Sequence, residues 1–177
     1  AKQAYERVAG HYGVQIKAFH ADNSRFDDKA FKTSCLHAGQ QLTFCAVGAH
    51  HQNGIAENRI KLICNGARTV LLHAMRKWPK VIRTTLWPYA MQAVVDRHNR
   101  LALGPDGKSP LEKFANIDDE IDTTAFHTFG CPAFVLEAAN QAGLGGTPKW
   151  DPRSRTGIYL GRSPSHARNV ALILNIQ

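Results

Sequence analysis

The stretch VQIKAFHADNSRFDDKAFKTSCLHAGQQLTFCAVGAHHQNGIAE, residues 14–57, decides the fold of this 177-residue chain. Val14 to Ala21 alternates apolar and polar side chains as a strand does, and Gln41 to Val47 is a second run of this kind. The segment between them predicts a helix that ends before Gly39. A strand, a helix and a strand in so few residues predict two parallel strands and therefore an α/β fold.

The other elements follow from the same kinds of signal. The longest is a helix over residues 53–77, because apolar residues recur there at steps of four and three. We expect Asp27 or Asp28 to cap the helix before Gly39, and Thr85 to cap a helix over 86–99. The remaining expected elements are helices over 2–12 and 109–114 and strands over 133–136, 157–161 and 169–176.

An acidic connector over residues 117–122 separates two parts of different character. Residues 1–116 alternate strands and helices, whereas residues 123–177 hold short strand-like runs, a glycine-rich loop and proline turns. The sequence therefore predicts an α/β core over 1–116 and a small β-barrel-like module over 123–177.

Composition excludes several classes of protein. No apolar run approaches the roughly 18 residues of a membrane-spanning helix, so we expect no membrane partner. The four cysteines are scattered without a C-x-x-C pair, which disfavours a zinc knuckle or a disulfide scaffold and favours reduced thiols inside a cell. The chain opens within a helical pattern and without Met, as expected of a piece of a longer protein.

The positive charge is confined to one part of the chain. The formal net charge is +8, and residues 58–100 carry all of this excess, with nine Lys and Arg side chains against the single acid Asp96. Such a block is typical of a surface that faces nucleic acid. Charge alone does not separate this interpretation from a solvated helical face.

Two carboxylates are expected at the same edge of the sheet. Asp22 follows the first strand directly, and Glu57 lies near the start of the helix after the second strand. Parallel strands place both at the carboxyl edge, where oxygen ligands suit Mg²⁺ or Mn²⁺. Spacing alone favours a plainer alternative, in which Asp22 caps a turn and Glu57 pairs with Lys61 four residues further on.

The long helix also carries a stripe that fits DNA. Glu57, Lys61, Cys64 and Arg68 recur at steps of four, three and four, so two cations follow the acid along one face. The amides of Gln52 and Asn53 precede the helix, where phosphate is readily bound. A solvent-exposed stripe without a ligand is the alternative.

Three histidines offer a different metal chemistry. His50 and His51 beside His20 could form a transition-metal cluster. Adjacent loop histidines usually point apart, so contacts between polar loop histidines and phosphate are the favoured interpretation.

A series of short motifs follows in a fixed order along the chain, and thirty-four residues separate Asp22 from Glu57. The motifs lie at residues 21–23, Phe26, 51–58, 67–68, 71–72, Trp87, 99–100, 109–112, 129–131, 151–154 and 157–161. Their order and spacing resemble the integrase of copia-type LTR retrotransposons, a family of transposable-element DDE polynucleotidyl transferases in which the two acids are similarly spaced. The motifs at 151–154 and 157–161 resemble the Src-homology-3-like module that follows the core in copia-type polyproteins.

The resemblance implies an RNase H-like core and metal-dependent 3′-end processing and strand transfer of element DNA into target DNA. It implies Asp22 and Glu57 as catalytic metal ligands for a two-ion Mg²⁺ or Mn²⁺ site. The residues that we expect to contact DNA are Gln52, Asn53, Arg59, Lys61 and Arg68. The resemblance further implies a homo-oligomer in the full-length protein, and a location in the nucleus or a virus-like particle of the host cell.

The sequence departs from the family in ways that bear on activity. The segment after Asp22 is one residue short, and His51 replaces the usual proline. The first Asp of the triad has no counterpart between Ala1 and Ala21, where Glu6 lies on the opening helix. We therefore expect a truncated core and an inactive fragment. The alternatives are a non-catalytic nucleic-acid-binding fragment of a decayed retrotransposon polyprotein and a relic without activity.

Overall fold

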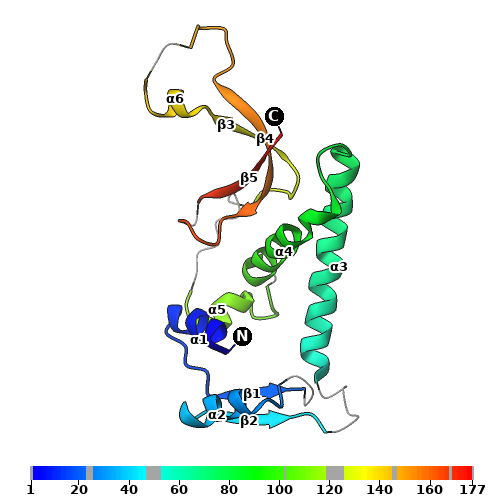
Figure 1. Ribbon diagram of the computed structural model, residues 1–177, viewed down its shortest axis with the longest axis vertical. Helices are drawn as coiled ribbons and strands as arrows, with labels where there is room; N and C mark the ends of the chain where they lie inside the picture. The colour runs from blue at the N-terminus through cyan, green and yellow to red at the C-terminus, as the bar shows by residue number, and fades with distance from the viewer. Residues whose placement is uncertain are drawn as a thin grey trace. The chain divides into compact units, whose positions relative to one another are not determined.

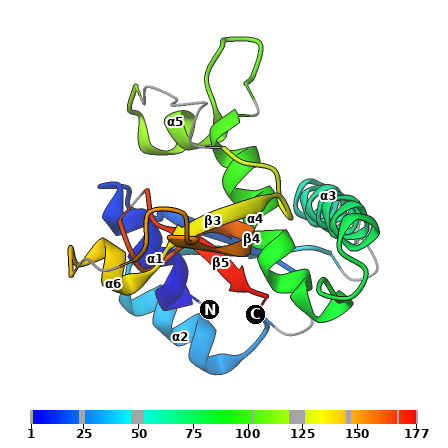
Figure 2. The same ribbon diagram turned by 90° about the horizontal axis from the view of Figure 1, so that it is seen from above.

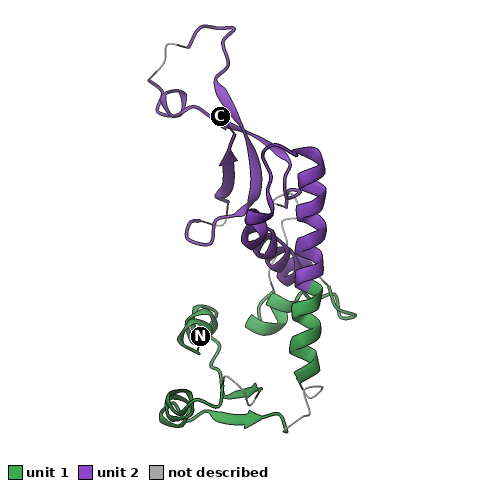
Figure 3. Cartoon of the chain, turned by 45° about the vertical axis from the view of Figure 1, so that its right-hand side comes forward, with its two compact units in different colours: residues 1–62, 102–119 green, residues 63–101, 120–177 purple. Residues whose placement is uncertain are grey.

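The computed structural model describes residues 2–22, 26–46, 53–101, 103–118, 126–144, 147–167 and 169–176. In these residues the chain is mixed α/β, with two small sheets (Figure 1). It forms two compact units, residues 1–62 with 102–119 and residues 63–101 with 120–177 (Figure 3). These units differ from the segments 1–116 and 123–177, whose status as domains stays a prediction. No described helix is long and apolar enough to cross a bilayer.

The first unit contains a parallel two-stranded sheet. Strand β1 (Ala18–Ala21) pairs with β2 (Gln41–Phe44), and the parallel pairing that the sequence predicts is confirmed. The register runs from Ala18 opposite Gln41 to Ala21 opposite Phe44. Both strands are shorter than expected. Because β2 begins at Gln41, residues 14–17 precede the first paired position of β1.

Side-chain caps mark the starts of two helices of this unit, α2 and α5. Asp28 caps α2, since its Oδ2 accepts a hydrogen bond of 3.2 Å from the Phe31 N–H, whereas Asp27 pairs with Lys32. Ser109 caps α5 in a reciprocal capping box with Glu112. The helices of this unit are α1 (Lys2–His11), α2 (Lys29–His37) and α5 (Pro110–Ala115), together with the start of α3 (Gly54–Lys77).

The second unit contains an antiparallel sheet in the order β3-β4-β5. The predicted strands are present, but the described residues form an open three-stranded sheet and not a closed barrel. Two further differences concern helices: Thr85 lies within the 3₁₀ turn η2 and is no cap, and the short helix α6 was not expected. The elements are η2 (Thr84–Leu86), α4 (Trp87–Leu101), β3 (Pro132–Leu136), α6 (Ala138–Gln141), β4 (Ser154–Arg162) and β5 (Ala171–Asn175).

The core of the second unit lies where α3 and α4 meet this sheet, and Figure 2 shows α4 beside β4. Small residues allow the helices to come close: a Cβ at Gly66 would lie 3.0 Å from Cγ1 of Val94 on α4. Burial of these apolar side chains is the main force that holds the unit together. The buried residues are Ala67, Leu71, Ala74, Ile82, Ala90, Phe129, Ile158 and Leu160.

Candidate carboxylate site and nucleic-acid interface

Asp22 stands at the carboxyl edge of the small parallel sheet. It follows Ala21, the last residue of β1, which is paired with Phe44 at the end of β2. Its side chain is half-buried. The parallel register thus supports the predicted position of Asp22, because both strands end at the same edge of the sheet.

Glu57 lies in the first turn of α3 and is exposed to solvent. Asn53 is half-buried directly before the helix, as predicted, whereas Gln52 lies outside the described residues. The described residues contain no group of three or more His, Cys, Asp or Glu side chains arranged to hold a metal ion. A cation shared by Asp22 and Glu57 therefore stays a prediction.

The ring of His20 is bonded to neighbours on the sheet. Its Nδ1 lies 2.9 Å from Thr43 Oγ1, and its Nε2 lies 3.5 Å from Cys45 Sγ. The Thr43 hydroxyl also lies 3.4 Å from the Phe19 carbonyl, to which it donates. The sequence did not predict this cluster, because the register that pairs His20 with Thr43 depends on how the two strands come together. His50 and His51, the other members of the suggested cluster, lie outside the described residues.

The stripe along α3 is exposed at every position. Glu57, Lys61, Cys64 and Arg68 all face solvent, and so does Arg59, which lies off the stripe. In the described part of the chain, Glu57 and Lys61 form no ion pair, contrary to the plainer alternative of an i, i+4 pair. The cations of the stripe are thus available to an anionic ligand.

The basic segment 58–100 keeps most of its charge uncompensated. Its single acid, Asp96, is held by Arg100 at 3.2 Å and by Arg162 of β4 at 2.7 Å. Within residues 63–100, the part of this segment that belongs to the second unit, six exposed cations have no acidic partner among the described residues. They are Arg68, Arg76, Lys77, Lys80, Arg83 and Arg97.

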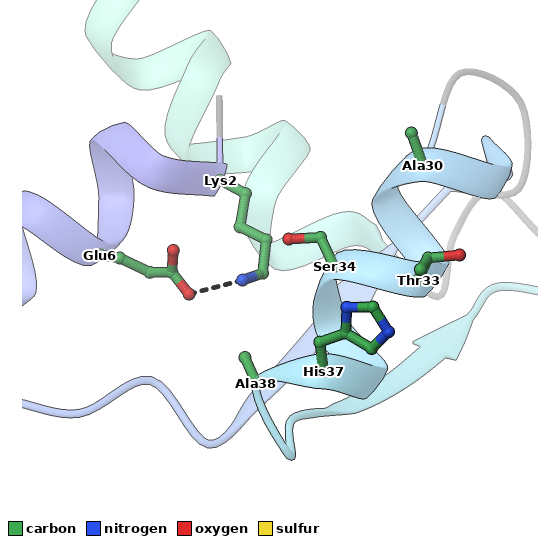
Figure 4. A pocket seen from close by; sticks show the side chains of 7 residues that line it. All are labelled: Lys2, Glu6, Ala30, Thr33, Ser34, His37 and Ala38. Atoms are coloured by element: carbon green, nitrogen blue, oxygen red, sulfur yellow. Dashed lines mark hydrogen bonds and ion pairs between the residues drawn. The ribbon is translucent and has the colours of Figure 1, made fainter.

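A cleft of about 640 Å³ lies between α1 and α2 in the first unit (Figure 4). On the α1 side of the cleft, Lys2 and Glu6 point toward each other, with 2.6 Å between Nζ and Oε1. Hydrogen bonds from Lys2 and then Gln40 hold the pKa of Glu6 below its ordinary value. The lysine is thus neutralised within the fold. The lining residues are Lys2, Glu6, Ala30, Thr33, Ser34, His37 and Ala38, none of which the sequence predicts as a site residue.

Comparisons with known proteins find a likeness among solved structures, and none by sequence. No protein-family model matches the chain, and no curated protein matches it. Among solved structures, it is similar to a chain of the simian T-cell lymphotropic virus intasome in complex with PP2A regulatory subunit B56 gamma, at 12% sequence identity and a TM-score of 0.46. The match covers 98% of this chain and 60% of that one. A likeness at this level carries no functional argument.

Proposed function

We propose that this chain carries part of an integrase-type site for phosphoryl transfer on DNA, within a truncated RNase H-like core of the copia type. The observation that supports the proposal is the parallel pairing of β1 with β2. Asp22 comes directly after β1, and Glu57 lies in the first turn of the helix that follows β2. In an open α/β sheet this edge is where ligands bind.

Asp22 and Glu57 are the residues that would hold Mg²⁺ or Mn²⁺. These hard cations prefer oxygen ligands, and both residues supply carboxylate oxygens, so the type of ligand suits the ion. When bound, the ion would polarise a phosphoryl oxygen and activate the attacking oxygen. Two carboxylates are one fewer than the triad that the resemblance implies. We therefore expect residues 1–177 to bind DNA without processing its 3′ ends or joining them to a target.

The other residues of the site would bind and orient the DNA. Lys61 and Arg68 carry exposed charges along α3, where they can neutralise successive phosphates. The Asn53 amide, immediately before the helix, can donate a hydrogen bond to a phosphate oxygen. The proposed substrates are the element ends and the target DNA, and the proposed active form is a homo-oligomer of the full-length protein.

A non-catalytic nucleic-acid-binding protein is the second candidate. The observation that favours it is the set of six exposed, uncompensated cations in the second unit, which binds a polyanion whether or not the carboxylates hold a metal. Strand transfer of a labelled duplex, measured with a longer form of the protein that supplies the first Asp, would distinguish the two candidates. Joining that is lost in Glu57→Gln supports the enzyme, whereas DNA binding without any joining supports the non-catalytic alternative.

Replacing Lys61 with alanine tests the DNA contact on α3. Lys61→Ala should weaken binding about equally across DNA sequences, because phosphate carries no sequence information. The slope of log K against log salt should fall by about one unit. The measurement is fluorescence anisotropy of a labelled duplex over a series of salt concentrations.

Lys108→Ala is the matched control in the same unit. It removes the same charge from an exposed lysine that already pairs with Asp118 at 2.8 Å, so its slope should stay close to that of the wild type. A Lys61→Ala variant with the wild-type slope and affinity would show that the stripe is merely solvated.

A further inference from the structure

A second cleft lies in the second unit, beside the end of α3. Its volume is about 440 Å³, within the range of small-ligand sites. One wall comes from His73, Lys77 and Trp78, and the other comes from the segment that leads into β3, including Cys131 and Pro132. The cleft therefore combines aromatic and aliphatic surface with a lysine at its edge.

The wall formed by Trp78 is fixed in place. The Trp78 indole N–H donates a hydrogen bond of 2.8 Å to the Gly130 carbonyl across the cleft. Its own carbonyl accepts from the Val81 and Ile82 N–H groups at 3.0 and 2.9 Å, and Ile82 is only 1% exposed. The connector between α3 and α4 is thus anchored from inside, and the cleft is preformed.

The last turn of α3 and the connector that follows it carry exposed cations. Arg76, Lys77, Lys80 and Arg83 are all exposed and belong to the uncompensated set. Cations in the last turn of a helix are ordinary, because they complement the helix dipole. Lys80 and Arg83 lie beyond α3, so the dipole does not account for them. The charge complements an anionic chain that passes over the connector.

We propose that this cleft and its cationic rim bind an unpaired DNA strand, with a base in the cleft and flanking phosphates on Lys77 and Lys80. An unpaired nucleotide offers both a planar apolar face and a negative charge, the combination that the cleft and rim match. Duplex DNA keeps its bases stacked and cannot present them here. This inference rests on the proposed action on DNA and adds a contact surface away from the carboxylates.

Alkylation of two cysteines distinguishes DNA binding at this cleft from DNA binding at the stripe on α3. Cys131 lines the cleft, and Cys64 lies on the exposed stripe with Lys61 and Arg68. Cys35 and Cys45 are only 1% and 3% exposed, so an alkylating reagent reaches them slowly. Alkylation of the native chain therefore reports occupancy of the cleft at Cys131 and of the α3 stripe at Cys64.

The test measures N-ethylmaleimide modification of each cysteine by peptide mass spectrometry, with and without a thymidine oligonucleotide. We expect the single strand to slow modification of Cys131 about tenfold when its concentration is ten times the dissociation constant. An equal length of duplex should protect Cys131 much less. The double variant Lys77→Ala/Lys80→Ala should lose the protection, whereas Lys108→Ala/Lys113→Ala, which removes two lysines paired with acids, should keep it.

Burial raises the pKa of the Cys131 thiol. The reactive thiolate of Cys131 therefore forms at a higher pH than that of an ordinary thiol, and its rate of modification should rise as the pH is raised through the alkaline range. Rates are compared at one alkaline pH. An unchanged Cys131 rate with the single strand, or equal protection by duplex, would overturn the proposal. Protection of Cys64 from modification, measured in the same digest, shows separately whether DNA binds at the α3 stripe of the proposed function.

Discussion

Gly130→Ala is expected to lower the free energy of unfolding of the second unit by about 3 kcal/mol, because it combines backbone strain with overpacking. Gly130 has φ 84°, a conformation that side chains disfavour. An added Cβ would lie 2.5 Å from the Cβ of Ala74 and 3.3 Å from its Cα. Ala74 is 1% exposed, so it cannot move aside into solvent. The substitution should push the segment before β3 away from α3.

Gly143→Ala separates the two contributions. Gly143 has φ 71° in the same unit, but an added Cβ there meets nothing within 4 Å. Only the backbone cost of about 1 kcal/mol should remain. Urea unfolding followed by tryptophan fluorescence is the measurement, since Trp78, Trp87 and Trp150 all belong to the second unit. Equal losses in the two variants would contradict the close approach of Gly130 to α3.

Asp96→Ala is expected to cost about 2 kcal/mol of unfolding free energy, because it leaves a largely buried guanidinium without its counter-ion. Arg162 is 12% exposed, and its Nε donates to Asp96 Oδ2 at 2.8 Å. Nη2 is also close to this oxygen, at 2.7 Å, but it lacks hydrogen-bond geometry and contributes only charge attraction. The expected loss is below that of a fully buried pair, because Asp96 is 32% exposed and water screens it.

The matched control for Asp96→Ala is Asp151→Ala. Asp151 is an exposed acid of the same unit, and its removal changes the net charge by the same amount. The same fluorescence-monitored unfolding should show a change within about 0.5 kcal/mol for this variant. If the two variants lose equal stability, the contact between α4 and β4 through Arg162 contributes nothing measurable.

Local signals predicted those elements whose ends are set by nearby residues. Asp28 and Ser109 cap their helices through side-chain bonds to residues three positions away, and such bonds are visible in the order of residue types. The lengths of β1 and β2 were less predictable, because a strand extends only as far as its partner pairs with it. Val14 to Lys17 has a strand pattern, yet β2 begins too late to pair with it.

Contacts between distant residues could not be predicted from such patterns. The bond from Trp78 to Gly130 joins positions 52 residues apart, and only the folded unit brings them together. The same holds for the cluster of His20 on β1, Thr43 on β2 and Cys45, which directly follows β2. Of the candidate site, the sequence predicted the strand edge and the exposed cations. The cleft beside Trp78 had no signal in the sequence.

Paramagnetic broadening by Mn²⁺ tests whether Asp22 and Glu57 share one divalent cation. Amide signals of the ¹⁵N-labelled 177-residue chain would be followed by NMR during a titration with substoichiometric Mn²⁺. We expect the signals adjacent to Asp22 and those adjacent to Glu57 to broaden together, and we expect Asp22→Asn to remove the broadening at both places. Broadening near only one carboxylate, or broadening near Glu57 that persists in Asp22→Asn, would contradict the shared site.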